Sequence, residues 1–110
     1  MRTDLKLIKK YFIIFCKKDI YGLTKLFHNN IVLKDWEGIY KGRSAVTKKN
    51  KIIFSDCKKI RIKIVNIIKK KNIFCIQLKI FISSSRKAIE VIDLITINNN
   101  KIKKIEAYKR

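Results

Sequence analysis

The sequence predicts an α+β fold in which helices pack on one face of an antiparallel sheet. Two observations predict this class: apolar residues recur at helical spacing in the first half, and from Lys58 onward they recur at every second position. Turn signals divide the second half, so its strands are expected to form consecutive hairpins. The 110 residues are expected to form one domain, 1–110, because neither a repeat nor a linker interrupts them.

Three helices are expected in the first half. The apolar stripe that begins at Leu5 predicts a helix over residues 3–17. Asp19 can cap a second, short helix, and the run His28-Asn29-Asn30 is typical of a stop. A thinner stripe predicts a third helix over residues 43–54.

Strands are expected on both sides of the third helix. Residues 31–36 alternate as a strand, and a short extended piece, residues 39–40, leads to Gly42. The second half is predicted to have turns at 69–72, 83–87 and 98–100 and a last strand over 101–108. Alternation places these residues on shared faces: Ile60, Ile62, Ile64 and Ile68; Ile76, Leu78, Ile80 and Ile82; Ile89, Val91, Ile95 and Ile97.

Two carboxyl groups are in phase with apolar residues. Asp93 shares the phase of Val91 and Ile95, and Asp35 continues the apolar alternation of the strand before it. An ionised carboxylate is costly to bury unless it is paired or protonated, so both positions are candidates for chemistry. The alternative is that each lies at a strand end, in water or paired with a basic residue. Tyr11 faces inward by helical phase, either as a core residue or as a phenol with a polar partner.

The net charge of +20 comes from 28 basic and 8 acidic residues. One explanation is a surface for nucleic acid, and the other is the codon usage of an AT-rich genome, since Ile, Lys and Asn make up 54 of 110 residues. The second is favoured because Lys outnumbers Arg by 23 to 5, and Arg suits base and phosphate recognition better. Phe74 and Phe81 are the only candidate stacking rings in the middle strands. The chain is therefore expected to bind nucleic acid only weakly and in a salt-sensitive way.

Cysteine and histidine usage predicts no metal site and no cofactor. Cys16, Cys57 and Cys75 have no C-x-x-C spacing, and the chain has one His. Three reduced thiols are typical of a cytoplasmic protein. The longest apolar run, Tyr11–Cys16, is too short for a signal peptide or a membrane span, so no membrane association is expected.

The order of these features resembles the nuclear transport factor 2-like superfamily, and its SnoaL-like polyketide cyclase and ketosteroid isomerase branches most closely. The resemblance implies a cone-shaped, curved sheet with the three helices on its concave face, a cystatin-like α+β roll. It covers nearly the whole chain and rests on these segments: Tyr11, Lys18-Asp19-Ile20, Leu26-Phe27, Ile31 to Asp35, Tyr40-Lys41-Gly42-Arg43, Val91-Ile92-Asp93-Leu94 and Asn100 to Tyr108.

The isomerase resemblance implies a role for each of the three inward-facing polar residues. Asp35 matches the family's general base, and Tyr11 and Asp93 match its oxyanion hole, in which the acid is kept neutral by an apolar site. Trp36 stands where those relatives often have proline. The resemblance therefore implies acid/base enolisation of a small hydrophobic carbonyl compound.

Two other functions stay open at this stage. The chain could be a non-catalytic ligand-binding or dimerisation module of the same fold, or a basic nucleic-acid-binding protein. The resemblance implies a homodimer through the outer face of the sheet. That face is expected to hold like charges, such as Arg61, Lys63 and Lys79, which would repel across a two-fold axis.

Overall fold

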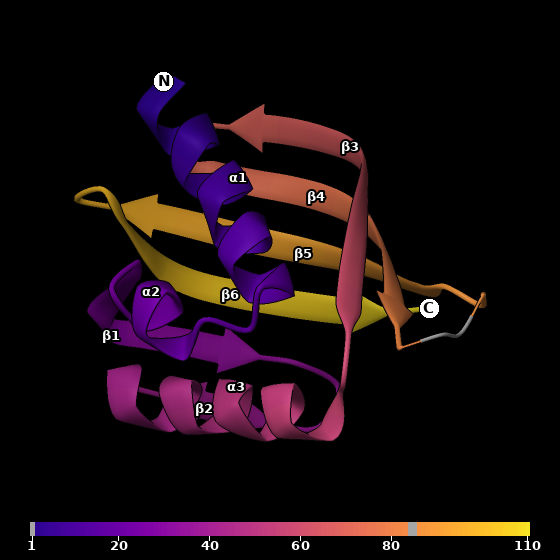
Figure 1. Ribbon diagram of the computed structural model, residues 1–110. Helices are drawn as coiled ribbons and strands as arrows, with labels where there is room; N and C mark the ends of the chain where they lie inside the picture. Colours follow the sequence, from indigo (N-terminus) through magenta and orange to yellow (C-terminus); the bar gives the residue numbers. More distant parts are fainter. Residues whose placement is uncertain (1, 84–85) are drawn as a thin grey trace.

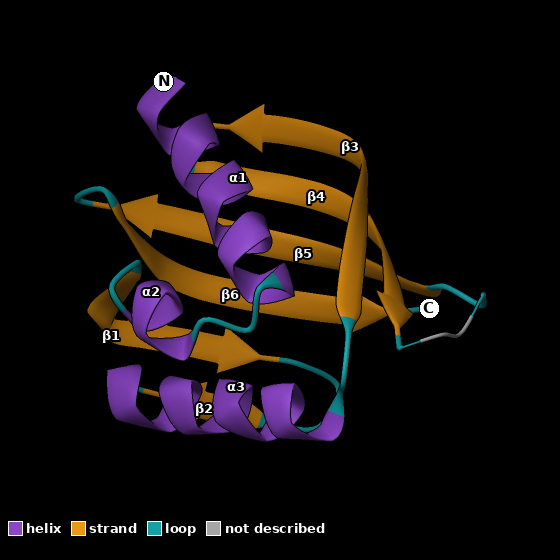
Figure 2. Ribbon diagram, in the orientation of Figure 1, coloured by secondary structure: helices purple, strands orange, loops and turns teal. Residues whose placement is uncertain are grey.

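The computed structural model describes residues 2–83 and 86–110. Three helices and six strands follow in an order that confirms the predicted fold class (Figures 1 and 2). Their bounds are α1 Arg2–Cys16, α2 Ile20–Thr24, β1 Phe27–Lys34, β2 Ile39–Lys41, α3 Arg43–Asp56, β3 Ile60–Lys70, β4 Ile73–Ile82, β5 Ile89–Asn98 and β6 Lys101–Lys109. The predicted turn over 83–87 includes residues 84 and 85, which lie outside the described residues.

The six strands form one curved sheet in the order β2-β1-β6-β5-β4-β3. Strands β3 to β6 are joined as consecutive antiparallel hairpins, which confirms that part of the prediction. The sheet as a whole is mixed, however, because β1 runs parallel to β6. The purely antiparallel prediction was wrong here, since β1 reaches β6 through the intervening helix and hairpins and not through a tight turn.

The helices lie on the concave side of this sheet (Figure 1). Ile8 and Phe12 give α1 its buried stripe, and α1 crosses the sheet diagonally. The Asp19 side chain caps α2 by accepting a hydrogen bond of 3.0 Å from the backbone N–H of Gly22. Val46 and Phe54 bury one face of α3 against β1. None of the helices in the described part of the chain has the length and apolarity needed to cross a bilayer.

Strand β1 begins earlier than the sequence predicts. His28, Asn29 and Asn30 were predicted as a stop, yet they lie inside β1, which starts at Phe27 opposite Ile102 of β6. The pairing is irregular between Phe27 and Val32, so the polar residues occupy a bulged stretch. Sheet pairing has overridden the local preference of these residues for turns.

Strand β3 changes phase part-way along its length. The register with β4 shifts between Ile64 and Asn66. Beyond this irregularity Ile67 is half-buried and Ile68 is 67% exposed, so the prediction that Ile68 shares the inward face of Ile64 was wrong. One extra residue in a strand turns every later side chain to the opposite face.

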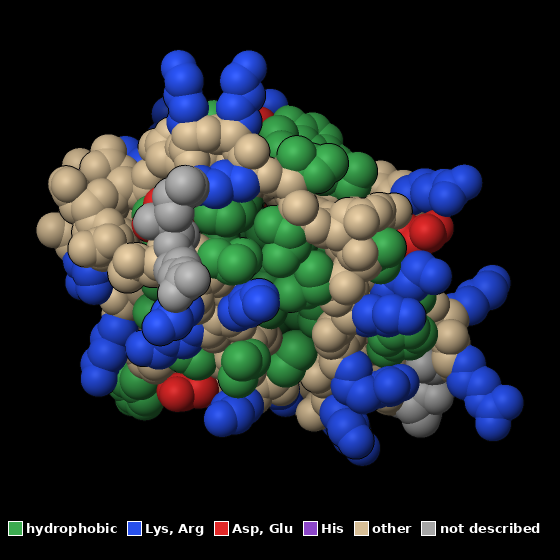
Figure 3. Space-filling model, turned by 90° about the horizontal axis from the view of Figure 1, so that it is seen from above, with side chains coloured by type: hydrophobic (Ala, Val, Ile, Leu, Met, Phe, Trp, Pro, Cys, Tyr) green, Lys and Arg blue, Asp and Glu red, His purple; other side chains and the backbone are tan. Residues whose placement is uncertain are grey.

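The core fills the concave side between helices and sheet. Its largest fully buried side chains are Phe27, Phe74, Ile8, Leu23, Ile31, Ile76, Leu78, Ile95, Ile102 and Val46. Phe74, which the sequence offered as a stacking ring, is only 1% exposed and cannot stack on a base. Figure 3 shows Lys and Arg side chains scattered around the rim of one face, not gathered into a single stripe.

The Gly42→Ala substitution is expected to lower the free energy of unfolding by about 1–3 kcal/mol. Gly42 precedes α3 with φ of 91° and ψ of 154°, a conformation that essentially only glycine adopts. A Cβ atom there would meet nothing within 4 Å, so the loss comes from backbone strain alone.

Gly38→Ala is the matched control, because Gly42 is the only glycine with positive φ among the described residues. Its added Cβ would lie 3.5 Å from the Tyr40 hydroxyl, an ordinary contact. Urea unfolding of both variants measures the difference. Equal losses would show that the conformation of Gly42 is not what the fold requires.

Candidate functional site

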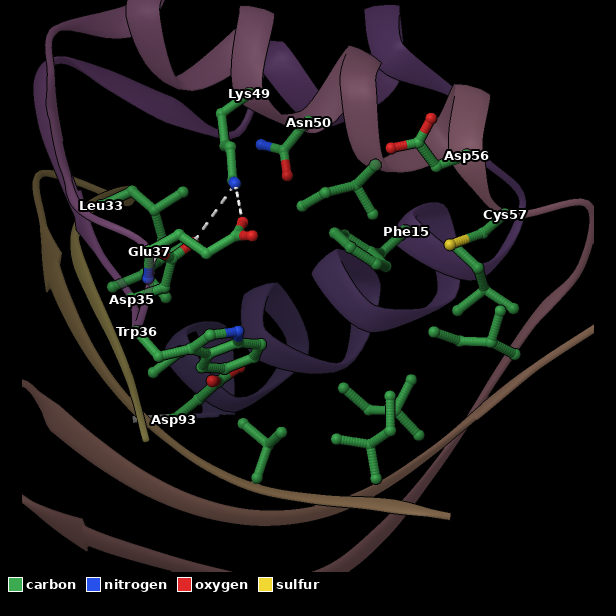
Figure 4. A pocket seen from close by; sticks show the side chains of 18 of the residues that line it. Phe15, Leu33, Asp35, Trp36, Glu37, Lys49, Asn50, Asp56, Cys57 and Asp93 are labelled. Atoms are coloured by element: carbon green, nitrogen blue, oxygen red, sulfur yellow. Dashed lines mark hydrogen bonds and ion pairs between the residues drawn. The ribbon is translucent and has the colours of Figure 1, made fainter. Parts of the chain in front are cut away.

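A cavity of about 350 Å³ lies between the helices and the concave face of the sheet (Figure 4). Its apolar lining comes mainly from isoleucines of β3, β4 and β5, from Phe15 of α1 and from Cys57. Polar and aromatic lining residues are Tyr11, Asp35, Trp36, Glu37, Lys49, Asn50, Asp56 and Asp93. The cavity therefore has the size and apolar character of a small-molecule site with a few polar groups.

Asp93 is a buried carboxyl group without a charged partner. It lies in β5, opposite Ile76 of β4 and Ala107 of β6, and is 7% exposed. No residue in the described ranges forms an ion pair or a hydrogen bond with it, although the chain carries 28 basic residues. Burial raises the pKa of Asp93 to about 7, because desolvation disfavours the charged form. The alternative of a wet or salt-bridged Asp93 therefore does not apply.

Tyr11 brings a phenol from α1 to the same cavity. It is 6% exposed, and its ring packs edge-on against Phe12 with centroids 5.0 Å apart. Burial, and then the charge of Asp93, raise the pKa of Tyr11 above its usual range. Within the described residues no hydrogen bond joins Tyr11 to Asp93. Both groups are thus neutral near pH 6 and able to donate to a ligand.

Asp35 lies just beyond the end of β1, in the turn that leads to β2. Its Oδ1 accepts hydrogen bonds from the backbone N–H groups of Glu37, at 2.8 Å, and Gly38, at 3.0 Å. Its Oδ2 lies 4.0 Å from Nζ of Lys49, and the side chain is 9% exposed. One oxygen therefore holds the turn together, while the other faces Lys49 at the cavity.

Lys49 of α3 is a site residue that the sequence reasoning missed. Its ammonium forms an ion pair with Glu37, lies near Asp35 and stands 5.2 Å from the centre of the Tyr40 ring. The hydrogen bond between them lowers the pKa of Glu37 and raises that of Lys49. The signal was available, because Lys49 lies three residues after Val46 and four before Ile53, on the apolar stripe of the predicted helix.

Comparisons with known proteins match this fold. No protein-family model matches the sequence, and no curated protein matches it. A nuclear transport factor 2-like protein of unknown function from Cytophaga hutchinsonii superposes with a TM-score of 0.81 at 13% identity, over 97% of this chain and 89% of that one. The chain has the nuclear transport factor 2-like fold.

Two further structures with this fold are named for a candidate enzyme activity. A candidate ketosteroid isomerase from Kribbella flavida superposes with a TM-score of 0.85 at 7% identity, over 100% of this chain and 79% of that one. A candidate polyketide cyclase from Sinorhizobium meliloti superposes with a TM-score of 0.83 at 14% identity, over 93% of each chain. At such identities the likeness is one of fold, so function has to be argued from the cavity.

The nuclear transport factor 2-like fold brings Tyr11, Asp35 and Asp93 to one cavity from three distant elements. Asn50 joins them from α3; it is 3% exposed, and its Nδ2 donates to the carbonyl of Val46 at 3.1 Å. Figure 4 shows the Asn50 carbonyl oxygen turned toward the cavity, where it can accept a hydrogen bond. Across residues 2–83 and 86–110, no group of three His, Cys, Asp or Glu side chains is placed to hold a metal ion.

Proposed function

We propose that the chain is a small-molecule enzyme that enolises a hydrophobic carbonyl compound in the concave cavity. One observation carries the proposal: Asp93, a buried carboxyl without a charged partner, and the Tyr11 phenol line the same apolar cavity as a second carboxylate, Asp35. Two neutral donors and one carboxylate are what enolisation requires.

The chemistry assigns one role to each group. Oδ2 of Asp35 takes the α-proton of the bound carbonyl compound, and the electrons of that C–H bond form the enolate. Tyr11 and protonated Asp93 donate hydrogen bonds to the carbonyl oxygen as negative charge develops there. Return of the proton from Asp35 to a second carbon would complete an isomerisation.

A non-catalytic binding module is the second candidate. The observation that favours it concerns Asp35, whose Oδ1 already accepts two backbone N–H groups and whose Oδ2 faces Lys49. The only role of a carboxylate with these contacts can be to stabilise the turn between β1 and β2. Binding without proton transfer would then be the whole activity of the cavity.

The experiment that separates the two candidates uses a planar ketone. The protein is incubated with 2-tetralone in D₂O, and replacement of the α-protons by deuterium is followed by NMR above the buffer rate. Catalysed exchange supports the enzyme. Binding of 2-naphthol, an enol mimic, without any exchange of the ketone supports the binding module, and failure to bind either compound rejects both.

The Tyr11→Phe variant is expected to lower the exchange rate by about 10²-fold, the usual cost of one oxyanion donor. The phenol forms no hydrogen bond with another described residue, so the melting temperature is expected to change little. Rate and thermal unfolding are measured on the same samples. A large drop in melting temperature with an unchanged rate would make Tyr11 a core residue only.

A further inference from the structure

Acidic residues gather around the cavity of this strongly basic chain. Four of its 8 acidic residues line the cavity, whereas Lys49 is the single basic lining residue in the described part of the chain. If the 28 basic and 8 acidic residues were spread evenly over the chain, basic residues would outnumber acidic ones in the cavity lining. The four are Asp35, Glu37, Asp56 and Asp93.

The positive charge of Lys49 offsets the negative charges on only one side of the cavity. Its ammonium pairs with Glu37 and lies 4.0 Å from Oδ2 of Asp35. Asp56, by contrast, forms no ion pair with any described residue. It is the last residue of α3, whose final turn holds no basic residue and whose end carries the negative pole of the helix dipole.

Lys18 reaches this end of α3, and its hydrogen bonds there are with the backbone. Its Nζ donates to the carbonyl oxygens of Cys57, at 2.6 Å, and Lys58, at 3.4 Å. It therefore satisfies carbonyl groups just beyond the helix and leaves the Asp56 carboxylate without an ion pair.

Tyr11, which takes no part in this balance of charge, adds a second observation that points to a ligand. Asp93 and Tyr11 are side chains more than nine-tenths buried, both line the cavity, and neither forms a hydrogen bond with another described residue. Among the described residues no fully buried polar side-chain atom lacks a partner, so the oxygens of Tyr11 and Asp93 border open cavity space, where a ligand oxygen placed between the two can accept a hydrogen bond from each. In Figure 4 Asp93 and Asp56 lie on opposite sides of the cavity, with Phe15 between them.

We propose that the cavity selects a hydrophobic cation: a planar molecule whose carbonyl or hydroxyl oxygen meets Asp93 and Tyr11 and whose protonated amine lies beside Asp56. This inference rests on the proposed function and adds the charge of the substrate to it. Phe15 supplies an aromatic surface along the path between the two polar ends. The ammonium of Lys18, which donates to a backbone carbonyl just beyond α3, opposes a cation at this end and limits the preference, whereas lysines beyond about 8 Å are screened by salt at physiological ionic strength.

The test uses three ligands of one shape and different charge: 2-naphthol, 6-aminomethyl-2-naphthol and 6-hydroxy-2-naphthoate. Each is titrated into the protein by calorimetry at neutral pH and physiological salt. The amine is expected to bind about fivefold more tightly than 2-naphthol, the upper end for an ion pair with an exposed carboxylate such as Asp56. The carboxylate is expected to bind more weakly than 2-naphthol by a similar factor.

Two variants assign the effect to one side chain. Asp56→Asn is expected to bring the affinity for the amine down to that for 2-naphthol and to leave 2-naphthol binding unchanged. Asp4→Asn is the matched control, because it makes the same change in net charge at the start of α1, away from the cavity lining. It is expected to preserve the preference for the amine.

The outcomes distinguish this inference from the function on which it rests. Equal affinities of the three ligands, or tightest binding of the carboxylate, would overturn the selection of a cation while leaving an occupied cavity. A preference for the amine that survives Asp56→Asn would overturn the assignment to Asp56. If none of the three ligands binds, both the inference and the proposed function fail.

Discussion

Replacing Asp35 with Asn is expected to lower the rate of α-proton exchange by about 10²- to 10⁴-fold, the usual contribution of a positioned general base. An amide cannot take the proton. The amide oxygen can still accept the hydrogen bonds from the backbone N–H groups of Glu37 and Gly38, so the turn is expected to persist. The melting temperature is therefore expected to stay close to that of the wild-type protein, and NMR exchange and thermal unfolding measure the two effects.

Asp19→Asn is the matched control for this variant. Asp19 also accepts a backbone N–H hydrogen bond, from Gly22, but it lies at the start of α2 and does not line the cavity. Its exchange rate is expected to equal that of the wild-type protein. An unchanged rate in Asp35→Asn would remove Asp35 from the mechanism, and an equal loss in both variants would point to a general effect on folding.

Replacing Asp93 with Asn is expected to remove a large pH dependence from the stability of the protein. Burial raises the pKa of Asp93 from 3.8 to about 7, so between these values the folded chain binds a proton that the unfolded chain has lost. The stabilisation is complete below the lower value and is lost as the pH rises through about 7. At 1.36 kcal/mol for each pH unit, the loss is about 4 kcal/mol.

The measurement compares denaturant unfolding of the two proteins at about pH 4 and about pH 8. The free energy of unfolding of Asp93→Asn, relative to the wild-type protein, is expected to rise by about 4 kcal/mol over this interval. Glu90→Gln, on the same strand, is the control, because its surface ion pair with Arg110 contributes about 1 kcal/mol or less. A difference that does not change with pH would show that Asp93 ionises as freely in the folded chain as in water.

A homodimer through the outer face of the sheet remains a prediction. Lys63 of β3 stands directly opposite Lys79 of β4, and both point away from the helices. Half-exposed apolar residues, including Ile92 and Tyr108, share this face. Light scattering as a function of salt would test it, since added salt is expected to favour association by screening the like charges.

Periodicity in the sequence was enough to place side chains on faces. An alternation of two directs Asp93 inward together with Val91 and Ile95, and a helical period does the same for Tyr11. These rules are local, because the direction of a side chain depends on the backbone geometry of its own element. They therefore predicted the helices, the hairpins and most of the core without any knowledge of long-range contacts.

Only the tertiary structure decided which of these faces meet. The parallel pairing of β1 with β6 and the shift in β3 depend on contacts between residues far apart in the chain. The same holds for the meeting of Tyr11 with Asp93 and for the partners of Lys49. The free energies of such contacts arise from packing and desolvation between residues that meet only in the folded chain. The spacing of residues along the sequence therefore does not predict them.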